Sequence, residues 1–361
     1  MTNSQIFQSS VVSAPSTPKR LLELDALRGI TVLLVVIFHL TMNDGQIRHW
    51  TKFGVTGVDL FFVISGFVIL LTLERINHWQ DFVISRFSRL YPTYWFCVTF
   101  TTVLVILKHI VLKEPLGGLP TQYLANMTMF QSYFRMANID GPYWTMTIEM
   151  LFYLFMFAIF LLKKLDKIEF IGSITLIPVI AYHLLLNTKY QPLHQTIGNL
   201  IPLINHFPLF LSGIIFYRIV SRKATFIRYL IIVFCFNLQY VLFFDGGSSN
   251  LFISHTDYGF MLAFYLTIFI LYANDNLNFI VNDFTLFFGK ISYGLYLIHQ
   301  FLGVEVIIPV FTKYFHANFL VSAILIAFPS VVVIAFLINK YIEKPAMVRI
   351  RGVYKKYQLT R

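Results

Sequence analysis

Charge is scarce in this sequence of 361 residues. Asp, Glu, Lys and Arg together make up 12% of it, whereas about 25% is usual for soluble domains. Hydrophobic residues make up 57%, and they include 39 Phe and 20 Tyr. The lack of charge excludes a soluble globular enzyme, and the high hydrophobicity excludes intrinsic disorder. The composition is that of a chain that lies in a membrane.

Cysteine is also scarce, and acidic residues are fewer than basic ones. Cys97 and Cys235 both lie inside apolar runs, so they indicate neither a disulfide framework nor a metal site. We interpret both as packing residues and expect no bound metal or cofactor. The excess of 28 Lys and Arg over 17 Asp and Glu gives a net charge of +11. This excess is typical of basic cytoplasmic loops in a membrane protein, so nucleic acid is not expected as a partner.

Ten apolar runs are long enough to cross a bilayer, which requires about 20 helical residues. They lie near residues 24–42, 53–73, 89–112, 144–162, 168–186, 198–219, 225–244, 257–273, 286–310 and 318–340. The sequence therefore predicts an all-α, polytopic integral membrane protein with about ten transmembrane helices. Residues 1–20 are expected to form an N-terminal tail, residues 21–346 the ten-span domain, and residues 347–361 a basic C-terminal tail.

The distribution of basic residues predicts the orientation of these spans. If the N-terminus is cytoplasmic, 21 of the 28 Lys and Arg residues fall in inner loops and 7 in outer loops. Cytoplasmic loops are enriched in Lys and Arg, so we expect both termini in the cytoplasm. We expect the chain to lie in the cell membrane, in contact with its lipids. The longest connection, residues 113–143, is then extracytoplasmic, and it is either an interfacial helix, a lid over a site or a passive cover.

Several ionisable side chains lie inside the predicted spans, where each costs about 2.5 to 3.5 kcal/mol or more. Arg28 and His39 are 11 residues apart in the first span, so they face the same side of a helix, about 16 Å apart. Asp59 in the second span and Glu149 in the fourth come to a depth similar to that of His39. Each residue alone is compatible with packing, capping or snorkelling. Their convergence favours a functional polar cavity, which could serve either proton-coupled transport or catalysis.

Arg86 and Arg89 lie three residues apart in the string SRFSRLYPTYW. On the first turns of a helix they share a face, and pairs of arginines suit bidentate recognition of phosphate. The enrichment of arginine in cytoplasmic loops explains their position equally well.

Six strings in the sequence resemble the membrane acyltransferase-3 family. They are LDALRGITVLLVVIFH, GVTGVDLFFVISGFVI, RFSRLYPTYW, WTMTIEMLFY, FGKISYGLYLIH and YIEKPA, and they occur in the family's order between residues 24 and 346. The resemblance implies an integral membrane O-acetyltransferase with ten spans. It also implies an acyl-CoA donor, most commonly acetyl-CoA, and a carbohydrate or lipid-linked saccharide acceptor.

The resemblance also implies roles for individual residues. The family's signature of Arg followed after ten residues by His falls on Arg28 and His39, and the Trp-x-x-x-x-Glu block falls on Trp144 and Glu149. A second acidic residue that often follows this glutamate is here Met150, so Glu149 lacks a carboxylate neighbour.

These residues lead to a mechanistic hypothesis. His39 is the expected general base because the ordinary pKa of histidine is near neutrality, and Asp59 or Glu149 would orient its ring. Arg28, Arg86 and Arg89 would bind the phosphates of acyl-CoA. The aromatic rings of Tyr143 and Trp144 would stack on a sugar, although anchoring at the membrane interface explains their position equally well.

Alternatives to this mechanism stay open. The sequence has no Gly-x-Ser-x-Gly motif, which argues against an acyl-serine intermediate, but an acyl-histidine intermediate is compatible with it. A proton-coupled secondary transporter would use the same intramembrane His, Asp and Glu residues without acyl-CoA. The sequence does not reveal the acceptor, the acyl chain length or the oligomeric state.

Overall fold

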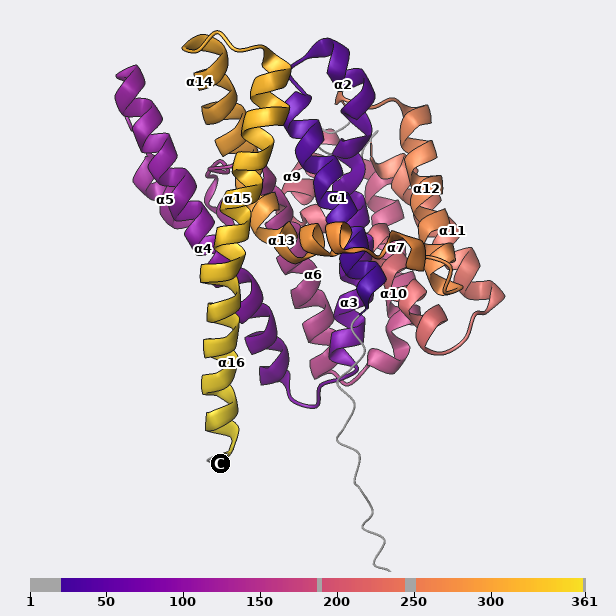
Figure 1. Ribbon diagram of the computed structural model, residues 1–361. Coiled ribbons are helices and arrows are strands. Elements are labelled where there is room, and N and C mark those ends of the chain that lie inside the picture. The colour runs from indigo at the N-terminus through magenta and orange to yellow at the C-terminus, as the bar shows by residue number, and fades with distance from the viewer. Residues whose placement is uncertain (1–20, 187–189, 244–250, 360–361) are drawn as a thin grey trace, which may run out of the picture.

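The computed structural model describes residues 21–186, 190–243 and 251–359, and these residues form helices and connecting turns without any strand. The helices, in chain order, are α1 (Leu22–Thr41), α2 (Gly45–Thr51), α3 (Gly57–Leu73), α4 (Trp79–Leu112), α5 (Leu119–Asn126), α6 (Trp144–Leu161), α7 (Ile168–Ala181), α9 (Gln191–Leu200), α10 (Phe207–Ser221), α11 (Phe226–Leu242), α12 (His255–Ala273), α13 (Asp283–Gln300), α14 (Ile308–Lys313), α15 (Phe328–Ile338) and α16 (Lys344–Leu359). Figure 1 shows them gathered into one bundle.

Eight helical segments of the described chain are long and apolar enough to cross a membrane. They are Leu22–Thr41, Gly45–Leu73, Trp79–Leu112, Gly141–Leu161, Leu165–Leu186, His255–Ala273, Asp283–Lys313 and Val321–Leu359. The other two predicted spans correspond to the shorter apolar helices α10 and α11. The prediction of an all-α, multi-pass membrane protein is therefore confirmed.

The short helix α10 lies inside the bundle. All residues from Phe207 to Ile219 are buried, and a helix that is apolar on every side is expected to be surrounded by protein or lipid. Its backbone touches that of α3, because a Cβ atom added to Gly66 would lie 2.0 Å from the carbonyl oxygen of Phe210. A Cβ atom on Gly213 would similarly lie 2.0 Å from the carbonyl oxygen of Val63. Small residues permit this close approach of membrane helices.

A second glycine contact joins α1 and α13. A Cβ atom on Gly29 would lie 2.1 Å from the carbonyl oxygen of Thr285, and one on Gly289 would lie 2.0 Å from that of Asp25. Further along the same pair, His39 on α1 meets His299 on α13. The two helices therefore run parallel, with their backbones in contact at Gly29 and Gly289, which places the polar residues of α1 beside those of α13.

The helix that begins with α13 changes geometry in its outer half. Residues Phe301–Ile307 form a π-helical segment before α14, and such segments occur frequently at functional sites. The buried carboxylate of Asp140 accepts the backbone N–H of Phe301 at 3.1 Å. Burial raises the pKa of Asp140 to about 7. Asp140 belongs to the long connection 113–143, so this connection, which also contains α5, is tied to the bundle at the point where α13 ends.

The C-terminal segment is a helix. The basic tail predicted at residues 347–361 is helical as far as Leu359, because α15 continues through the π-helical segment Asn339–Glu343 into α16. Figure 1 shows α16 extending past the other helices at one end of the bundle. Arg351 donates from Nε to the Ser88 hydroxyl at 3.0 Å, and Gln358 donates to Asp81 at 3.3 Å. Helix α16 therefore packs along the first turns of α4.

A network of ion pairs joins four helices. Arg218 on α10 is fully buried, and it pairs with Glu74, which follows α3, and with Glu169 on α7. Arg228 on α11 pairs with the same Glu169, at 2.7 Å from its Nη2 atom. The sequence analysis used these two arginines only as evidence of orientation. In the structure they also pair with partly exposed carboxylates, which neutralises the charge of the buried Arg218 and holds α3, α7, α10 and α11 together.

Candidate active site

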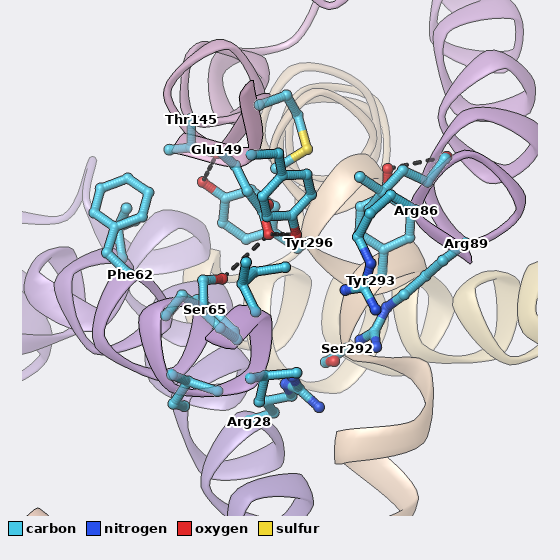
Figure 2. Close-up of a pocket in the computed structure, with 18 residues that line it drawn as sticks. Arg28, Phe62, Ser65, Arg86, Arg89, Thr145, Glu149, Ser292, Tyr293 and Tyr296 are labelled. Atoms are coloured by element: carbon cyan, nitrogen blue, oxygen red, sulfur yellow. Dashed lines mark hydrogen bonds between the residues drawn. The ribbon is translucent and has the colours of Figure 1, made fainter. Parts of the chain in front are cut away.

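Predicted phosphate-binding arginines from two helices line one cavity. We call it the arginine cavity. It is lined by Arg28 on α1, by Arg86 and Arg89 on α4, by Glu149 on α6 and by Tyr296 on α13, and its empty volume is about 740 Å³. Figure 2 shows the guanidinium groups of Arg86 and Arg89 close to one another beside Ser292, with Glu149 across the cavity. The structure therefore brings together four of the predicted site residues.

The arginines of α4 lack acidic partners. In the described chain no carboxylate lies within 4.0 Å of Arg86 or Arg89, whereas the buried Arg218 is paired with two. Arg86 donates to the hydroxyls of Ser85 and Thr72, at 3.3 and 3.5 Å, and its buried Nε atom has no partner. A buried charge is normally paired. The positive charges of these two arginines are therefore not neutralised by an ion pair within the described residues.

Glu149 is held by hydroxyl groups. Its Oε1 atom accepts the hydroxyl of Ser65 at 3.1 Å and that of Tyr153 over a shorter distance. The Tyr153 ring also faces Arg86, whose Cζ atom lies 5.9 Å from the ring centroid. Glu149 is consequently fixed on one wall of the arginine cavity, and it forms no ion pair within the described residues.

A larger cavity lies next to the first one. We call it the histidine cavity. It has an empty volume of about 2150 Å³, and its polar wall residues are His39, Asp59, Asn138, Trp144, Tyr182, His194, Gln195, Asn199, Asn205, His206, Tyr296 and Gln300. Val58 and Tyr296 line both cavities. The two cavities are therefore neighbours that are separated by these shared side chains.

His39 contacts a second histidine and not a carboxylate. Its Nδ1 atom lies 2.9 Å from the carbonyl oxygen of Val35 and 3.2 Å from Nε2 of His299. The Nδ1 atom of His299 lies 2.9 Å from the carbonyl oxygen of Tyr296. A carbonyl oxygen only accepts hydrogen bonds, so both Nδ1 atoms carry hydrogen, and the one hydrogen on Nδ1 of His39 is shared between the Val35 carbonyl oxygen and Nε2 of His299. The lone pair at Nε2 of His39 is therefore the basic site of this pair.

The expected carboxylate partners of His39 lie elsewhere. Asp59 lines the histidine cavity, but its carboxylate accepts the hydroxyl of Tyr258 on α12 at 2.8 Å. Glu149 lines the other cavity. In this structure neither carboxylate contacts the His39 ring, because Asp59 and Glu149 both accept hydrogen bonds from other hydroxyl groups and His299 lies beside His39.

The two aromatic residues predicted to bind a sugar lie in different places. Trp144 lines the histidine cavity and is 36% exposed, with its ring 5.6 Å from that of His206. Tyr143 is fully buried, its ring packs 5.1 Å from that of Tyr94, and it lines neither cavity. The stacking interaction expected of Tyr143 is therefore not available, and Trp144 alone presents a ring to the cavity.

Several cavity residues were missed by the sequence analysis. Ser65, Tyr153 and Tyr296 lie in the family-like strings, but hydroxyl groups inside apolar spans carry no charge signal. His194 is nearly buried, and its Nε2 atom has no partner. Burial lowers the pKa of His194. The clearest available signal was the single histidine of FGKISYGLYLIH, His299, which lies at the depth of His39.

Comparisons with known proteins agree with this architecture. The family model described as an acyltransferase domain, acyltransferase-3, matches residues 21–340. The O-acetyltransferase OatA of Staphylococcus aureus is 25% identical over 91% of this chain and 57% of its own length. The peptidoglycan O-acetyltransferase OatA of Listeria monocytogenes is 31% identical over 36% of this chain and 22% of its own length.

The chain thus spans little more than half the length of the Staphylococcus aureus relative and about a fifth of the Listeria relative. No solved structure matches it. The family match covers the helices that carry both cavities, from α1 through α15. The chain therefore belongs to the acyltransferase-3 family.

Proposed function

We propose that this protein transfers an acetyl group from acetyl-CoA to a hydroxyl group of a cell-surface carbohydrate or of its lipid-linked precursor. Family membership supports the acyl transfer, and the named activities of the OatA relatives support the acetyl group and the carbohydrate acceptor. The protein would do this in the cell membrane.

The arginine cavity is the proposed donor site. Arg86 and Arg89 have no carboxylate partners among the described residues, and planar guanidinium groups suit the oxygen atoms of a phosphate. By the predicted orientation, the first turns of α4 lie toward the cytoplasm, where acyl-CoA is found. Arg28 lines the same cavity and is partly neutralised by Asp25, whose carboxylate lies 3.2 Å from its Nη1 atom. The donor's diphosphate would therefore bind between α1 and α4.

The histidine cavity is the proposed acceptor site. Its polar wall is rich in histidine and amide side chains, which form directional hydrogen bonds with hydroxyl groups. Trp144 offers an aromatic face to an apolar side of a sugar ring. Because the cavity is lined by the outer connection and by α9, an acceptor would enter from the outer side.

The observation that carries the proposal is that the two cavities share Val58 and Tyr296 as a wall. A thioester that extends from the arginine cavity meets an acceptor in the histidine cavity at this wall. His39 Nε2 would take the proton of the acceptor hydroxyl, and the oxygen would attack the thioester carbonyl carbon. The new C–O bond forms, the C–S bond breaks, and the proton on His39 passes to the departing CoA thiolate.

In this mechanism His299 stabilises and orients the general base His39. When His39 is protonated at Nε2, the positive charge is stabilised by the hydrogen bond from Nδ1 to Nε2 of His299. The same bond holds the ring in one orientation, which is the function of a carboxylate in a serine-type triad. Asp59 and Glu149 stay candidate catalytic residues, each on the wall of one cavity.

The test is acetyl transfer by the purified protein in detergent or proteoliposomes. Labelled acetyl-CoA is supplied with saccharide fragments of the cell wall, and both free CoA thiol and labelled saccharide are measured. We expect the two products to appear in equal amounts and to disappear in His39→Ala. The matched control is His49→Ala, because His49 is an exposed histidine on α2 that lies outside both cavities.

Two results would contradict the proposal. If the protein releases no CoA thiol with any saccharide, acetyl-CoA is not the donor. If it moves a saccharide or protons across the vesicle membrane without consuming acetyl-CoA, the cluster of His39 and Asp59 serves transport.

A further inference from the structure

Arg351 on α16 lies against the same turn of α4 that carries the arginines of the donor cavity. Its Nε atom donates to the Ser88 hydroxyl at 3.0 Å, and its Nη2 atom donates to the Ser85 carbonyl oxygen at 3.3 Å. Arg86 donates to the Ser85 hydroxyl at 3.3 Å. Two arginines from different helices therefore contact one serine, and Arg89 follows directly after the other serine.

This group of arginines forms no ion pair within the described residues. Among the residues that the structure describes, no carboxylate lies within 4.0 Å of Arg351, Arg86 or Arg89, although the other cytoplasmic arginine cluster is paired with Glu74 and Glu169. Like charges that are held close together repel one another, and an anion that binds between them relieves this repulsion.

Arg351 lies outside the arginine cavity, where the end of the donor that is opposite the thioester would lie. Arg86 and Arg89 line the arginine cavity, whereas Arg351 does not line it and is exposed on α16. By the predicted orientation, α16 leaves the membrane on the cytoplasmic side. Acyl-CoA has its thioester at one end and a phosphate on the 3′ position of its ribose near the other end, with the diphosphate between them. An extended donor whose diphosphate meets Arg86 and Arg89 directs that phosphate toward the mouth of the cavity.

We propose that Arg351 binds the 3′-phosphate of the acyl-CoA donor and so distinguishes this donor from analogues without that phosphate. The inference rests on the proposed acetyl-CoA donor. Arg351 already uses Nε and Nη2 on α4, and its Nη1 atom has no hydrogen-bond partner in the described chain. The two serine contacts hold the guanidinium in place, so little side-chain freedom is lost when a phosphate binds.

A purely structural role would give Arg351 a different behaviour. If its contacts with Ser85 and Ser88 serve only to fasten α16 to α4, its loss should affect all donors equally. The discriminating experiment therefore compares acetyl-CoA with acetyl-3′-dephospho-CoA, which retains the diphosphate and the thioester. Acetyl transfer is measured with the full-length wild-type protein and with Arg351→Gln, which keeps a polar side chain but removes the charge.

We expect Arg351→Gln to raise the KM for acetyl-CoA about tenfold, because one charge-assisted contact at a partly exposed site is lost. Its KM for acetyl-3′-dephospho-CoA should equal that of the wild type, which also shows that the variant is folded. The matched control is Arg349→Gln, because Arg349 is an exposed arginine two residues away on α16 and outside the α4 contact. Arg349→Gln should leave the KM for both donors unchanged.

The proposal is overturned if Arg351→Gln changes the KM for the two donors by the same factor, or changes neither. It is also overturned if Arg349→Gln reproduces the donor-specific effect, because the basic charge of α16 as a whole would then be responsible. If the wild type transfers no acetyl group from either donor, the acetyl-CoA donor itself is wrong. If the wild type uses acetyl-CoA and Arg351→Gln behaves like the wild type, only the proposed role of Arg351 is refuted, and the acetyl-CoA donor stands.

Discussion

The Nδ1 atom of His39 lies 3.2 Å from the Nε2 atom of His299, although the two residues are 260 positions apart in the chain. The rings lie 4.9 Å apart and are nearly perpendicular, at 70°. His299 is fully buried, whereas His39 is partly exposed to the histidine cavity. His39 therefore faces the histidine cavity, and the buried His299 contacts its ring on the side away from the cavity.

This relationship predicts different effects of the same substitution at the two positions. His39→Gln should lose about 10² to 10⁴-fold of the acetyl-transfer rate, because an amide takes up no proton from a hydroxyl group. His299→Gln should retain much more activity than His299→Ala, because the Gln side chain has an oxygen atom that can accept the Nδ1–H of His39. The measurement is kcat at saturating acetyl-CoA, with protein levels matched.

The KM for acetyl-CoA provides the control for this comparison. It should stay close to the wild-type value in all three variants, because neither histidine lines the arginine cavity. If His299→Gln is as inactive as His39→Gln, an acceptor at position 299 is insufficient. If His39→Ala transfers acetyl at a near-normal rate, the general base is another residue.

The unpaired arginines of α4 lead to a second prediction. Arg86→Gln and Arg89→Gln should each weaken donor binding by about 1.5 to 3 kcal/mol, because each removes a charge-assisted hydrogen bond to a phosphate. The effect should appear in the KM for acetyl-CoA and leave the KM for the acceptor unchanged. Arg75→Gln is the matched control, because Arg75 is exposed and lies on the same, cytoplasmic side of the membrane in the predicted orientation. If the KM for acetyl-CoA is the same in all three variants, Arg86 and Arg89 do not bind the donor, and their position reflects only the enrichment of arginine in cytoplasmic loops.

The sequence predicted most of the fold because the apolar runs are long and well separated. Its main error in the spans concerns residues 198–219. The helix there begins only at Phe207, with Pro208 in its first turn, a position that suits proline because its missing N–H has no partner there. Hydropathy alone did not reveal this break, because the turn before it contains apolar residues as well.

The candidate site was predictable in its residue types but not in its pairings. Depth along a helix follows from the number of residues, and it correctly grouped His39 with Asp59, which line one cavity. The direction of a side chain depends on the rotation of each helix, which is set by contacts such as Gly29 with Thr285. No local spacing encodes these contacts. The sequence therefore could not show that His299, and not Glu149, contacts His39.

The predicted orientation is tested by labelling single cysteines. A cysteine at Gln46 on α2 should react from outside with a reagent that does not cross the membrane, whereas one at Gln80 on α4 should react only after the membrane is opened. Both positions are exposed, and the native Cys97 and Cys235 are buried, so the background should be low. Labelling of the Gln80 position from outside in intact cells would reverse the assignment of both cavities.

The last prediction concerns the glycine contact that places α1 beside α13. In Gly289→Ala, the new Cβ atom would lie 2.0 Å from the carbonyl oxygen of Asp25, and a backbone atom is unable to move away without shifting the helix. The two helices must then separate, and His39 and His299 lose their hydrogen bond. We expect a lower melting temperature in detergent and a loss of acetyl transfer, with a cost of about 1 to 3 kcal/mol that is typical of overpacking.

The control for this variant is Gly352→Ala on α16. No atom lies within 4 Å of a Cβ atom added to Gly352, and alanine is favoured over glycine in a helix by about 0.5 to 1 kcal/mol. Gly352→Ala should therefore leave the melting temperature unchanged or raise it slightly. If Gly289→Ala is as stable and active as Gly352→Ala, α1 and α13 do not pack in backbone contact. The pairing of His39 with His299 would then lose its structural basis.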